Sequence, residues 1–230
     1  MDEKKQELND FLLSLARKYR LSVSELKNLV AEVAQELKSG SNVPRSAQIK
    51  VGWYAFEGGK FSSDPEAYPN LQGVVAWLNP DPNAPIGKRG LILMPDEVKL
   101  IWATDYYDTG IDDEEDGQAN TRKLIAYSIA HGQKNRMRFR AAEWCYAYYN
   151  DGVKPGDGFL PAKNQLKRIV DNLDIVNPAL EEIGGKILKH WIWSSSEYTG
   201  NSAWYVSASN GRVGSDVRDN YYYVRCVIAF

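Results

Sequence analysis

The first forty residues carry apolar side chains at helical spacing, in two stretches separated by the sequence RLSVSE. A helix turns once in 3.6 residues, so apolar residues three and four positions apart fall on one face. Ser22 or Ser24 can cap the second helix, and Gly40 can end it. We therefore predict a helical segment over residues 1–40 whose apolar stripes pack on the main domain or drive homo-oligomerisation. The stripes are Leu8, Phe11, Leu12, Leu15 and Tyr19, then Leu26, Leu29, Val30, Val33 and Leu37.

After a short polar linker, residues 41–48, the apolar pattern changes to short strand-like runs. The first run, IKVGWYAF, is separated from the next by Glu57-Gly58-Gly59, a sequence typical of a hairpin turn. Two further apolar runs follow, GVVAWLNP and RGLILMP, with a proline-rich surface loop between them. We place the start of one main domain, residues 49–230, at this change of pattern.

An acidic stretch, DYYDTGIDDEEDGQ, precedes four predicted helices. It lacks the carboxylate spacing of an EF-hand, which favours a solvated loop over a calcium site. Asn120-Thr121 can cap the first helix and Gly132 can end it, and Pro178 suits the first position of the fourth. His131 and His190 lie far apart without ligands at metal-binding spacing, so we predict no metal and no cofactor. The helices are predicted over RKLIAYSIAHG, RFRAAEWCYAYYNDG, LPAKNQLKRIVDNL and NPALEEIGG.

The C-terminal segment alternates apolar and polar residues in the pattern of a sheet. Asn210-Gly211 is the strongest short hairpin signal, so we place a turn there. The last ten residues, YYYVRCVIAF, are apolar after their tyrosines, as a central strand buried on both faces would be. Along the strand before the turn, alternation predicts Trp204, Val206 and Ala208 on the inner face and Tyr205, Ser207 and Ser209 on the outer face.

The predicted outer face has the residue composition of an antibody paratope. Tyrosine supplies rigid contact area, while serine and asparagine supply adaptable hydrogen bonds. A plain polar sheet face with turns would use the same residue types, so composition leaves both interpretations open. In the binding hypothesis Tyr198, Tyr205 and Tyr221 are anchors, and Arg212, Asp216 and Arg218 read charge. The candidate ligand-binding residues are Tyr198, Thr199, Asn201, Ser202, Tyr205, Ser207, Ser209, Arg212, Ser215, Asp216, Arg218, Asp219 and Tyr221.

Composition and charge exclude several classes of protein. The 230 residues are 43% hydrophobic and 25% charged, as in an ordinary globular protein, and the formal net charge of −2 argues against nucleic-acid binding. No apolar run approaches a membrane span, so we predict no membrane insertion. The N-terminus lacks the apolar core and the cleavage site of a signal peptide. Intracellular residence, release by lysis as part of a virion, or a leader trimmed from the chain all remain open.

No arrangement of residues in the sequence favours an enzyme. Catalysis needs a nucleophile with a base, a carboxylate pair or a metal cluster, and none occurs here at a meaningful spacing. The serine run Ser194–Ser196 is better explained as a turn whose hydroxyls satisfy backbone groups. The two cysteines, Cys145 and Cys226, are by count alone typical of two buried free thiols.

The main domain resembles the C-type-lectin-fold domains of the DUF1566 and Fibrobacter major paralogous domain type. Among these it is similar to the variable proteins of diversity-generating retroelements. The blocks that carry the resemblance are GVVAWLNP, GLILMP, CYAYYNDG, FLPAKNQL, NPALEEIGG, WSSSEYTGNSAWYV and YYYVRCVIAF, with the order and spacing of the last three the most specific. The first 40 residues lie outside it. The implied fold is α+β, a lectin-like domain of mixed antiparallel sheets with flanking helices, whose first and last strands lie close together.

The resemblance also bears on the cysteines and on sugar binding. A helix cysteine and a last-strand cysteine match the long-range lectin disulfide, which implies a bond between Cys145 and Cys226. The Glu-Pro-Asn and Trp-Asn-Asp triplets of calcium-dependent lectins are absent, which puts calcium-mediated sugar binding in doubt. The related formylglycine-generating enzymes use a cysteine site that has no counterpart here.

In retroelement variable proteins, scrambled template adenines turn asparagine codons into codons for Ser, Tyr, Asp, Gly, Thr or Arg, and the candidate residues come from nearly that set. The framework would be Trp193, Trp204, Val206, Val224 and Phe230. We therefore interpret the chain as a non-enzymatic receptor-binding protein of a virion or bacterial surface, with an unknown protein or glycan as partner. The alternatives are a structural phage-tail or pilus subunit with a fixed polar face and, less favoured, an enzyme of the formylglycine-generating fold.

Overall fold

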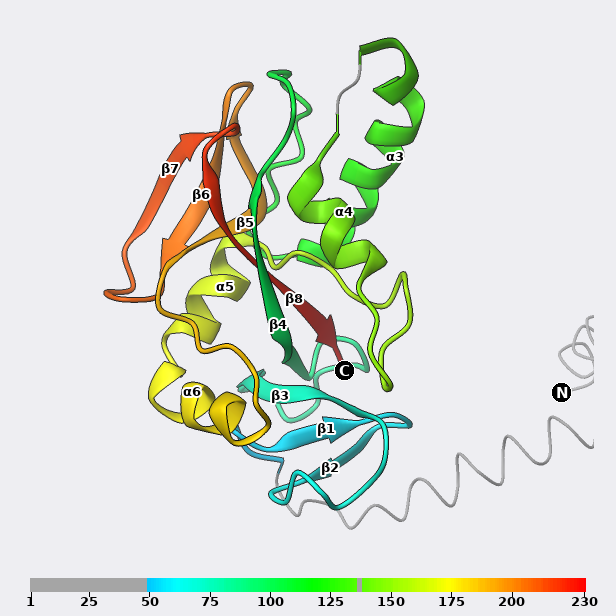
Figure 1. The fold of residues 1–230 in the computed structure, drawn as a ribbon, viewed down its shortest axis with the longest axis vertical. Helices are drawn as coiled ribbons and strands as arrows, with labels where there is room; N and C mark the ends of the chain where they lie inside the picture. Colours follow the sequence, from blue (N-terminus) through cyan, green and yellow to red (C-terminus); the bar gives the residue numbers. More distant parts are fainter. Residues whose placement is uncertain (1–48, 136–137) are drawn as a thin grey trace, which may run out of the picture. The chain divides into compact units, whose positions relative to one another are not determined.

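The computed structural model describes residues 49–135 and 138–230 (Figure 1). The helical segment predicted over residues 1–40 and the linker 41–48 lie outside the described residues. Their helices, and the oligomerisation inferred from them, stay predictions. Among the described residues the fold is mixed α+β, with an eight-stranded sheet and four helices.

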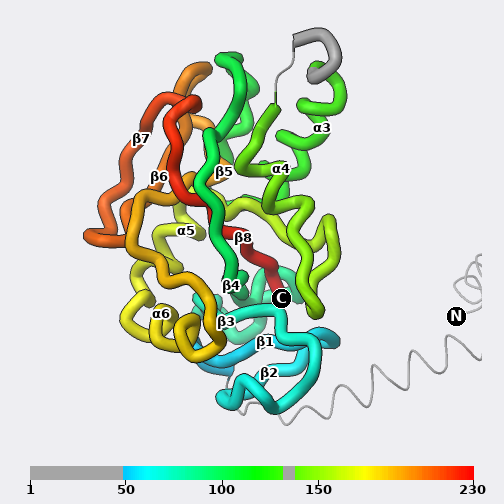
Figure 2. The backbone as a smooth tube through the Cα atoms, viewed as in Figure 1, coloured from blue at the N-terminus to red at the C-terminus, as the bar shows by residue number. Residues whose placement is uncertain are grey.

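The eight strands form a sheet in the order β2-β1-β3-β4-β8-β5-β6-β7. Neighbouring strands are antiparallel except β5 and β8, which are parallel. The terminal strand β8 lies between β4 and β5, which confirms the prediction of a central strand (Figure 2). The strands are β1 Tyr54–Phe56, β2 Lys60–Ser62, β3 Leu71–Leu78, β4 Gly90–Ile101, β5 Trp191–Thr199, β6 Ser202–Ser207, β7 Val213–Val217 and β8 Tyr221–Ala229.

Both predicted hairpins form, and each turns at the predicted residues. Gly58 and Gly59 have positive φ between β1 and β2, a backbone conformation that glycine adopts without strain. Gly211, also at positive φ, turns the chain between β6 and β7. The ring of Phe61 in β2 packs on that of Phe230, with 4.8 Å between centroids, so the first hairpin lies close to the end of the chain. The first and last strands themselves, β1 and β8, are separated in the sheet by β3 and β4.

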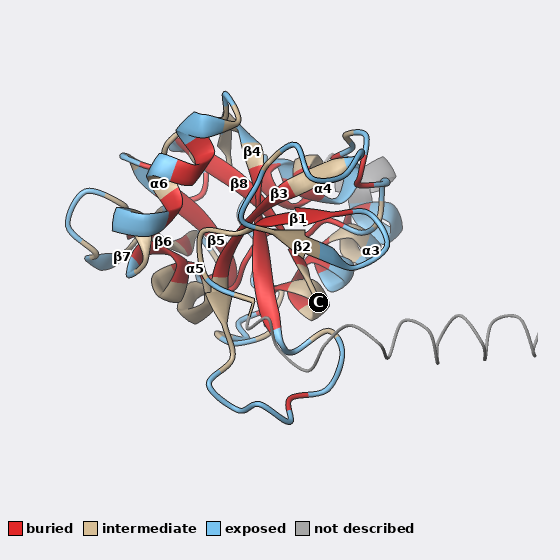
Figure 3. Cartoon of the chain, turned by 90° about the horizontal axis from the view of Figure 1, so that it is seen from below, coloured by how far each residue is buried: buried red, intermediate tan, exposed pale blue. Residues whose placement is uncertain are grey.

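Two helices cover each face of the sheet, as Figures 1 and 3 show. On one face, α3 and α4 pack over a core that includes Trp193 and Val224; on the other, α5 and α6 pack over a core that includes Val206. The central strands are therefore buried between two helical layers, whereas the edge strands β2 and β7 have no fully buried residue (Figure 3). The helices are α3 Gly117–Asn135, α4 Arg140–Ala147, α5 Lys163–Val170 and α6 Leu173–Glu182.

Two predicted helix starts were wrong. Helix α3 begins before Asn120 and Thr121, which lie buried inside it, and the Asp116 carboxylate accepts the Ala119 N–H at 2.9 Å in the manner of a cap. Gly132 likewise lies within α3 and does not end it. Helix α6 begins at Leu173, so Pro178 is interior, on an exposed side of the helix where water can satisfy the carbonyl it leaves free.

Candidate functional site

The thirteen candidate residues do not form one continuous outer face. The structure exposes seven of them, half-buries four and buries Ser207 and Arg218. The prediction that Ser207 and Arg218 face outward was therefore wrong. The exposed residues are Tyr198, Thr199, Asn201, Ser209, Arg212, Asp219 and Tyr221; Ser202, Tyr205, Ser215 and Asp216 are half-buried.

Ser207 and Tyr205 are covered because the second face of the C-terminal sheet also packs. The ring of Tyr205 stacks on that of Trp191 at 5.5 Å and meets the edge of Tyr222 at 5.1 Å. Gly214 makes room for this ring, since a Cβ there would lie 2.6 Å from the Tyr205 hydroxyl oxygen. The Ser207 hydroxyl is 3.0 Å from that of Ser209. Tyr205 is thus part of an aromatic stack, which restricts its use as an anchor.

The inner-face prediction is confirmed in part. Val206 is fully buried and Ala208 packs beside it, against the core under α5 and α6. Trp204 is only half-buried: Lys163 lies over its ring at 4.4 Å, and Tyr198 meets it at 4.6 Å. Of the predicted framework, Trp193, Val206 and Val224 are buried, and Trp204 and Phe230 are half-buried.

Arg218 is a structural residue and not an exposed reader of charge. Its guanidinium forms a buried ion pair with Glu197 and donates to the carbonyls of Tyr107 and Thr199, each at 2.7 Å. It also lies over the Trp102 ring at 4.7 Å. Burial lowers the pKa of Arg218 to about 10, which still leaves it charged at neutral pH.

Glu197 links this network to the loop after β4. Its carboxylate accepts the N–H of Thr109 at 3.0 Å and that of Ile111 at 3.3 Å, and the Thr109 hydroxyl also donates to it. The Arg218–Glu197 pair therefore joins the loop after β4 to the β5–β6 turn. These two segments lie together at the top of Figure 1.

We call the surface that this network supports the tyrosine tip. Tyr106 and Tyr107, on the loop after β4, are 50% and 53% exposed, and Tyr198, on β5 beside Trp204, is 52% exposed. Gly200 lies against Asp108, because a Cβ at this glycine would come within 3.2 Å of the Asp108 backbone nitrogen. A hydrogen bond to Asp219 raises the pKa of the Tyr106 hydroxyl. The tip consists of Tyr106, Tyr107, Asp108, Tyr198, Thr199, Asn201 and Asp219.

The contribution of the loop after β4 to this surface was not predicted from the sequence. Residues 105–118 were predicted to form a solvated acidic loop, and residues 105–108 are exposed as predicted. Ile111 is buried, and Gly117 and Gln118 already belong to α3. The position of the loop beside the β5–β6 turn depends on contacts with residues about ninety positions away. Two adjacent tyrosines, Tyr106 and Tyr107, were the signal that could have marked the loop as a contact surface.

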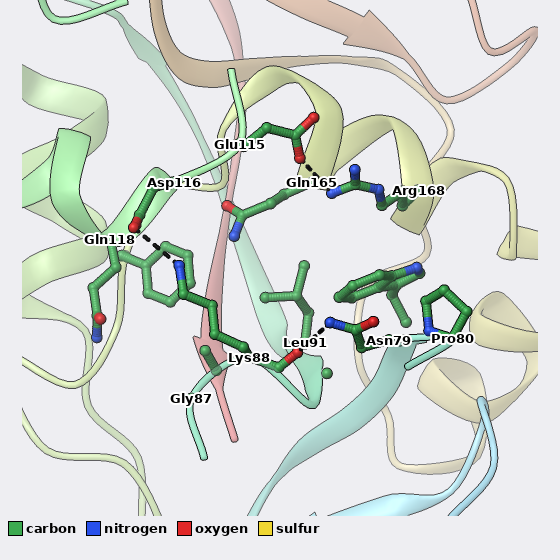
Figure 4. A pocket seen from close by; sticks show the side chains of 14 residues that line it. Asn79, Pro80, Gly87, Lys88, Leu91, Glu115, Asp116, Gln118, Gln165 and Arg168 are labelled. Atoms are coloured by element: carbon green, nitrogen blue, oxygen red, sulfur yellow. Dashed lines mark hydrogen bonds and ion pairs between the residues drawn. The ribbon is translucent and has the colours of Figure 1, made fainter. Parts of the chain in front are cut away.

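A groove lies at the other end of the sheet, with a volume of about 530 Å³ (Figure 4). Leu91 pairs with Ala229 at this end of β4 and β8, whereas Ile101 pairs with Tyr221 at the end nearer the tip. The ends are about 25 Å apart at the usual rise per residue. The sequence did not predict this groove. Its apolar lining includes Trp77, Leu91 and Phe159.

The charged side chains around this groove pair with one another. Lys88 lies 3.2 Å from Asp116, and Arg168 lies 2.7 Å from Glu115. The Arg168 guanidinium also lies over the Trp77 ring at 5.2 Å. Figure 4 shows both ion pairs at the rim. Because each of these cations has a carboxylate partner, a charged ligand would have to displace an existing ion pair.

The serine run does not form the predicted turn. Ser194, Ser195 and Ser196 are buried within β5, where the register with β6 shifts. Their hydroxyls do satisfy other groups: Ser194 donates to the Trp204 carbonyl at 2.9 Å and Ser196 to that of Asp113 at 2.7 Å. The part of the chain that the structure describes holds no group of three or more His, Cys, Asp or Glu side chains that could bind a metal.

Cys145 and Cys226 are free thiols in the structure, in place of the bond that the resemblance implies. Both are buried: Cys145 on α4 and Cys226 on β8. Burial, and then the neighbouring Cys226 thiol, raise the pKa of Cys145 well above its ordinary value. A thiol with a raised pKa stays protonated at neutral pH and is a poor nucleophile.

We expect the folded protein to react slowly with a thiol reagent at pH 8 and to take up two equivalents after denaturation. The reason is that both thiols are buried and that burial raises the pKa of Cys145. Time-resolved labelling followed by intact mass measures this. Rapid labelling of the folded protein would contradict it, and a denatured protein that accepts reagent only after reduction would establish the disulfide.

No family model and no curated protein matches the chain. A solved structure that matches is that of a fimbrial protein from Bacteroides ovatus, with a TM-score of 0.58 and 16% sequence identity. The match covers 79% of this chain and 49% of the fimbrial protein, so this chain corresponds to about half of that protein. At this identity the likeness establishes a shared fold. No helix among the described residues has the length and apolarity needed to cross a membrane.

Proposed function

We propose that the chain is a non-enzymatic recognition domain of a cell-surface or fimbrial-type protein, and that the tyrosine tip contacts its partner. The carrying observation is that three half-exposed tyrosines stand on segments held by the buried Arg218–Glu197 pair. Rigid aromatic contacts on a preorganised support lose little conformational entropy on binding. The lectin-type resemblance supports a binding role, and the fimbrial neighbour supports a location at a cell surface.

A finer form of this proposal is that the tip is diversified, as in retroelement variable proteins. Tyr198, Thr199, Asn201 and Asp219 belong to the residue set that adenine scrambling produces, and all four are exposed. Diversification should spare Arg218, because its side chain holds the support together. We expect a near-copy of the coding end, beside a reverse-transcriptase gene, whose differences fall on exposed positions. A locus without such a copy would leave a recognition surface of fixed sequence.

The fimbrial neighbour also favours a second candidate, a structural subunit of a surface filament. In that case the chain would bind copies of itself or other subunits, and its polar surfaces would bind no external ligand. Sedimentation of the purified chain over a range of concentrations separates the two functions. Ordered self-association without cell or glycan binding would favour the structural role.

We expect a triple variant to bind at least about tenfold more weakly; it combines Tyr106→Ala, Tyr107→Ala and Tyr198→Ala. Truncating a tyrosine that is buried in an interface often costs more than about 1 kcal/mol of binding free energy. Adhesion to a panel of bacterial and host cells, together with a glycan array, measures this. The matched control replaces three exposed tyrosines outside the tip: Tyr68, Tyr146 and Tyr149. Equal binding by the two triple variants would move the contact surface away from the tip.

A further inference from the structure

A second hollow, with a volume of about 410 Å³, opens where β4, β8 and β5 lie side by side. The sheet register places Tyr223 opposite Lys99 on one side and opposite Ile192 on the other. Lys189, His190 and Trp191 enter from the start of β5. We call it the basic aromatic hollow; its lining is Lys99, Lys189, His190, Trp191, Ser209, Tyr221, Tyr222 and Tyr223.

The hollow concentrates positive charge on a chain whose formal net charge is −2. Its lining contains two lysines and a histidine and no carboxylate. Among the described residues, neither Lys99 nor Lys189 forms an ion pair. This distinguishes the hollow from the groove in Figure 4, where Lys88 and Arg168 have carboxylate partners. Clustered cations without counter-charges favour an anionic ligand.

The aromatic walls are held in place by other rings. His190 stacks on Tyr223, with 4.4 Å between centroids and 11° between planes, and the Lys99 ammonium lies 6.0 Å from the Tyr223 ring centroid. Trp191 is 48% exposed, yet its ring rests on Tyr205 and on the edge of Tyr222 at 5.2 Å. Tyr221 is 61% exposed. Trp191 and the His190–Tyr223 stack therefore offer preorganised ring faces to a ligand.

We propose that the basic aromatic hollow binds an acidic glycan, a sugar that carries a carboxylate, sulfate or phosphate group. The apolar C–H face of the sugar ring packs on one of the two exposed rings of the lining, Trp191 or Tyr221, and the anionic group lies between Lys99 and Lys189. The hydroxyls of Ser209 and Tyr221 supply hydrogen bonds to the sugar hydroxyls. The volume is in the usual range of small-molecule sites, which fits one or two sugar units better than a polymer groove. The hollow shares no residue with the tyrosine tip.

The test titrates the full chain with sialyllactose, sulfated lactose, phosphorylated lactose and neutral lactose, followed by tryptophan fluorescence and calorimetry. We expect at least one acidic sugar to bind at least about tenfold more tightly than lactose. Its affinity should fall as salt is added. The three acidic sugars identify which anionic group is preferred. Equal affinity for lactose, or no binding of any of the acidic sugars, would overturn the proposal.

Two variants with the same net charge distinguish binding at this hollow from a general effect of the protein's net charge on sugar binding. The double variant Lys99→Gln, Lys189→Gln should bind the acidic sugar at least about tenfold more weakly, because two charge-assisted contacts are lost. Lys50→Gln with Lys154→Gln removes the same charge from exposed positions outside the hollow and should bind like the unmodified chain. Equal losses in both variants would overturn the site. Circular dichroism checks that both variants fold, and the triple tip variant should retain sugar binding, which keeps this test separate from that of the tip.

Discussion

Replacing Arg218 with alanine is expected to destabilise the domain by about 3–5 kcal/mol, the usual cost of removing one partner of a buried ion pair. The substitution leaves the Glu197 carboxylate buried without its cation, and it leaves the carbonyls of Tyr107 and Thr199 without their side-chain donor. It also empties the space over the Trp102 ring. Urea denaturation followed by far-UV circular dichroism measures the change in the free energy of unfolding.

Arg212→Ala is the matched control for this prediction, because Arg212 is exposed on the turn before β7. A surface substitution of this kind usually changes stability by no more than about 0.5 kcal/mol. Hydrogen exchange should also show that Arg218→Ala loosens residues 104–111, whose Thr109 and Ile111 amides donate to Glu197. Equal stability of the two arginine variants would show that the buried pair does not support the tip.

The sequence predicts local features of this fold well because their causes are local. The turns at Gly58-Gly59 and Asn210-Gly211 form where glycine can adopt positive φ, and the terminal strand β8 is central because it is apolar on both faces. Helix starts are less well predicted. Asn120 suits a cap by residue type, but its side chain instead donates to Ser195 at 3.2 Å, a partner 75 residues away.

The candidate site is predicted less well because polarity does not by itself mean exposure. Ser196 and Arg218 are polar residues of the kind that face water, yet remote carbonyls and a remote carboxylate satisfy them inside the domain. Arg225 shows the same limit within the apolar terminal strand: it is buried beside Glu97, at 3.7 Å. A single sequence shows residue types and spacing, and these partners appear only once the chain has folded.

The end of β5, residues 197–199, contributes both to the tyrosine tip and to the buried network under it. Tyr198 and Thr199 are exposed, whereas Glu197, the residue before them, is buried and accepts from Arg218. Side chains alternate along a strand, and the register with β6 shifts between Glu197 and Thr199, so neighbouring positions can serve support and contact independently. Substitution of the exposed positions should therefore change binding with little effect on stability, while substitution at Glu197 or Arg218 should change both.

Two tryptophans on adjacent strands test this division directly. Trp193→Ala is expected to cost about 3–5 kcal/mol, the range for truncating a buried tryptophan, because the side chain is fully buried and its indole N–H donates to the Leu100 carbonyl at 3.2 Å. Trp204→Ala makes the same chemical change at a half-buried position, and it should cost no more than about 2 kcal/mol. Both values come from urea denaturation under the same conditions. If Trp204→Ala were the more destabilising, Trp204 would be the framework residue that its spacing predicts, and the face under α5 would carry more of the stability than the aromatic stack around Trp193.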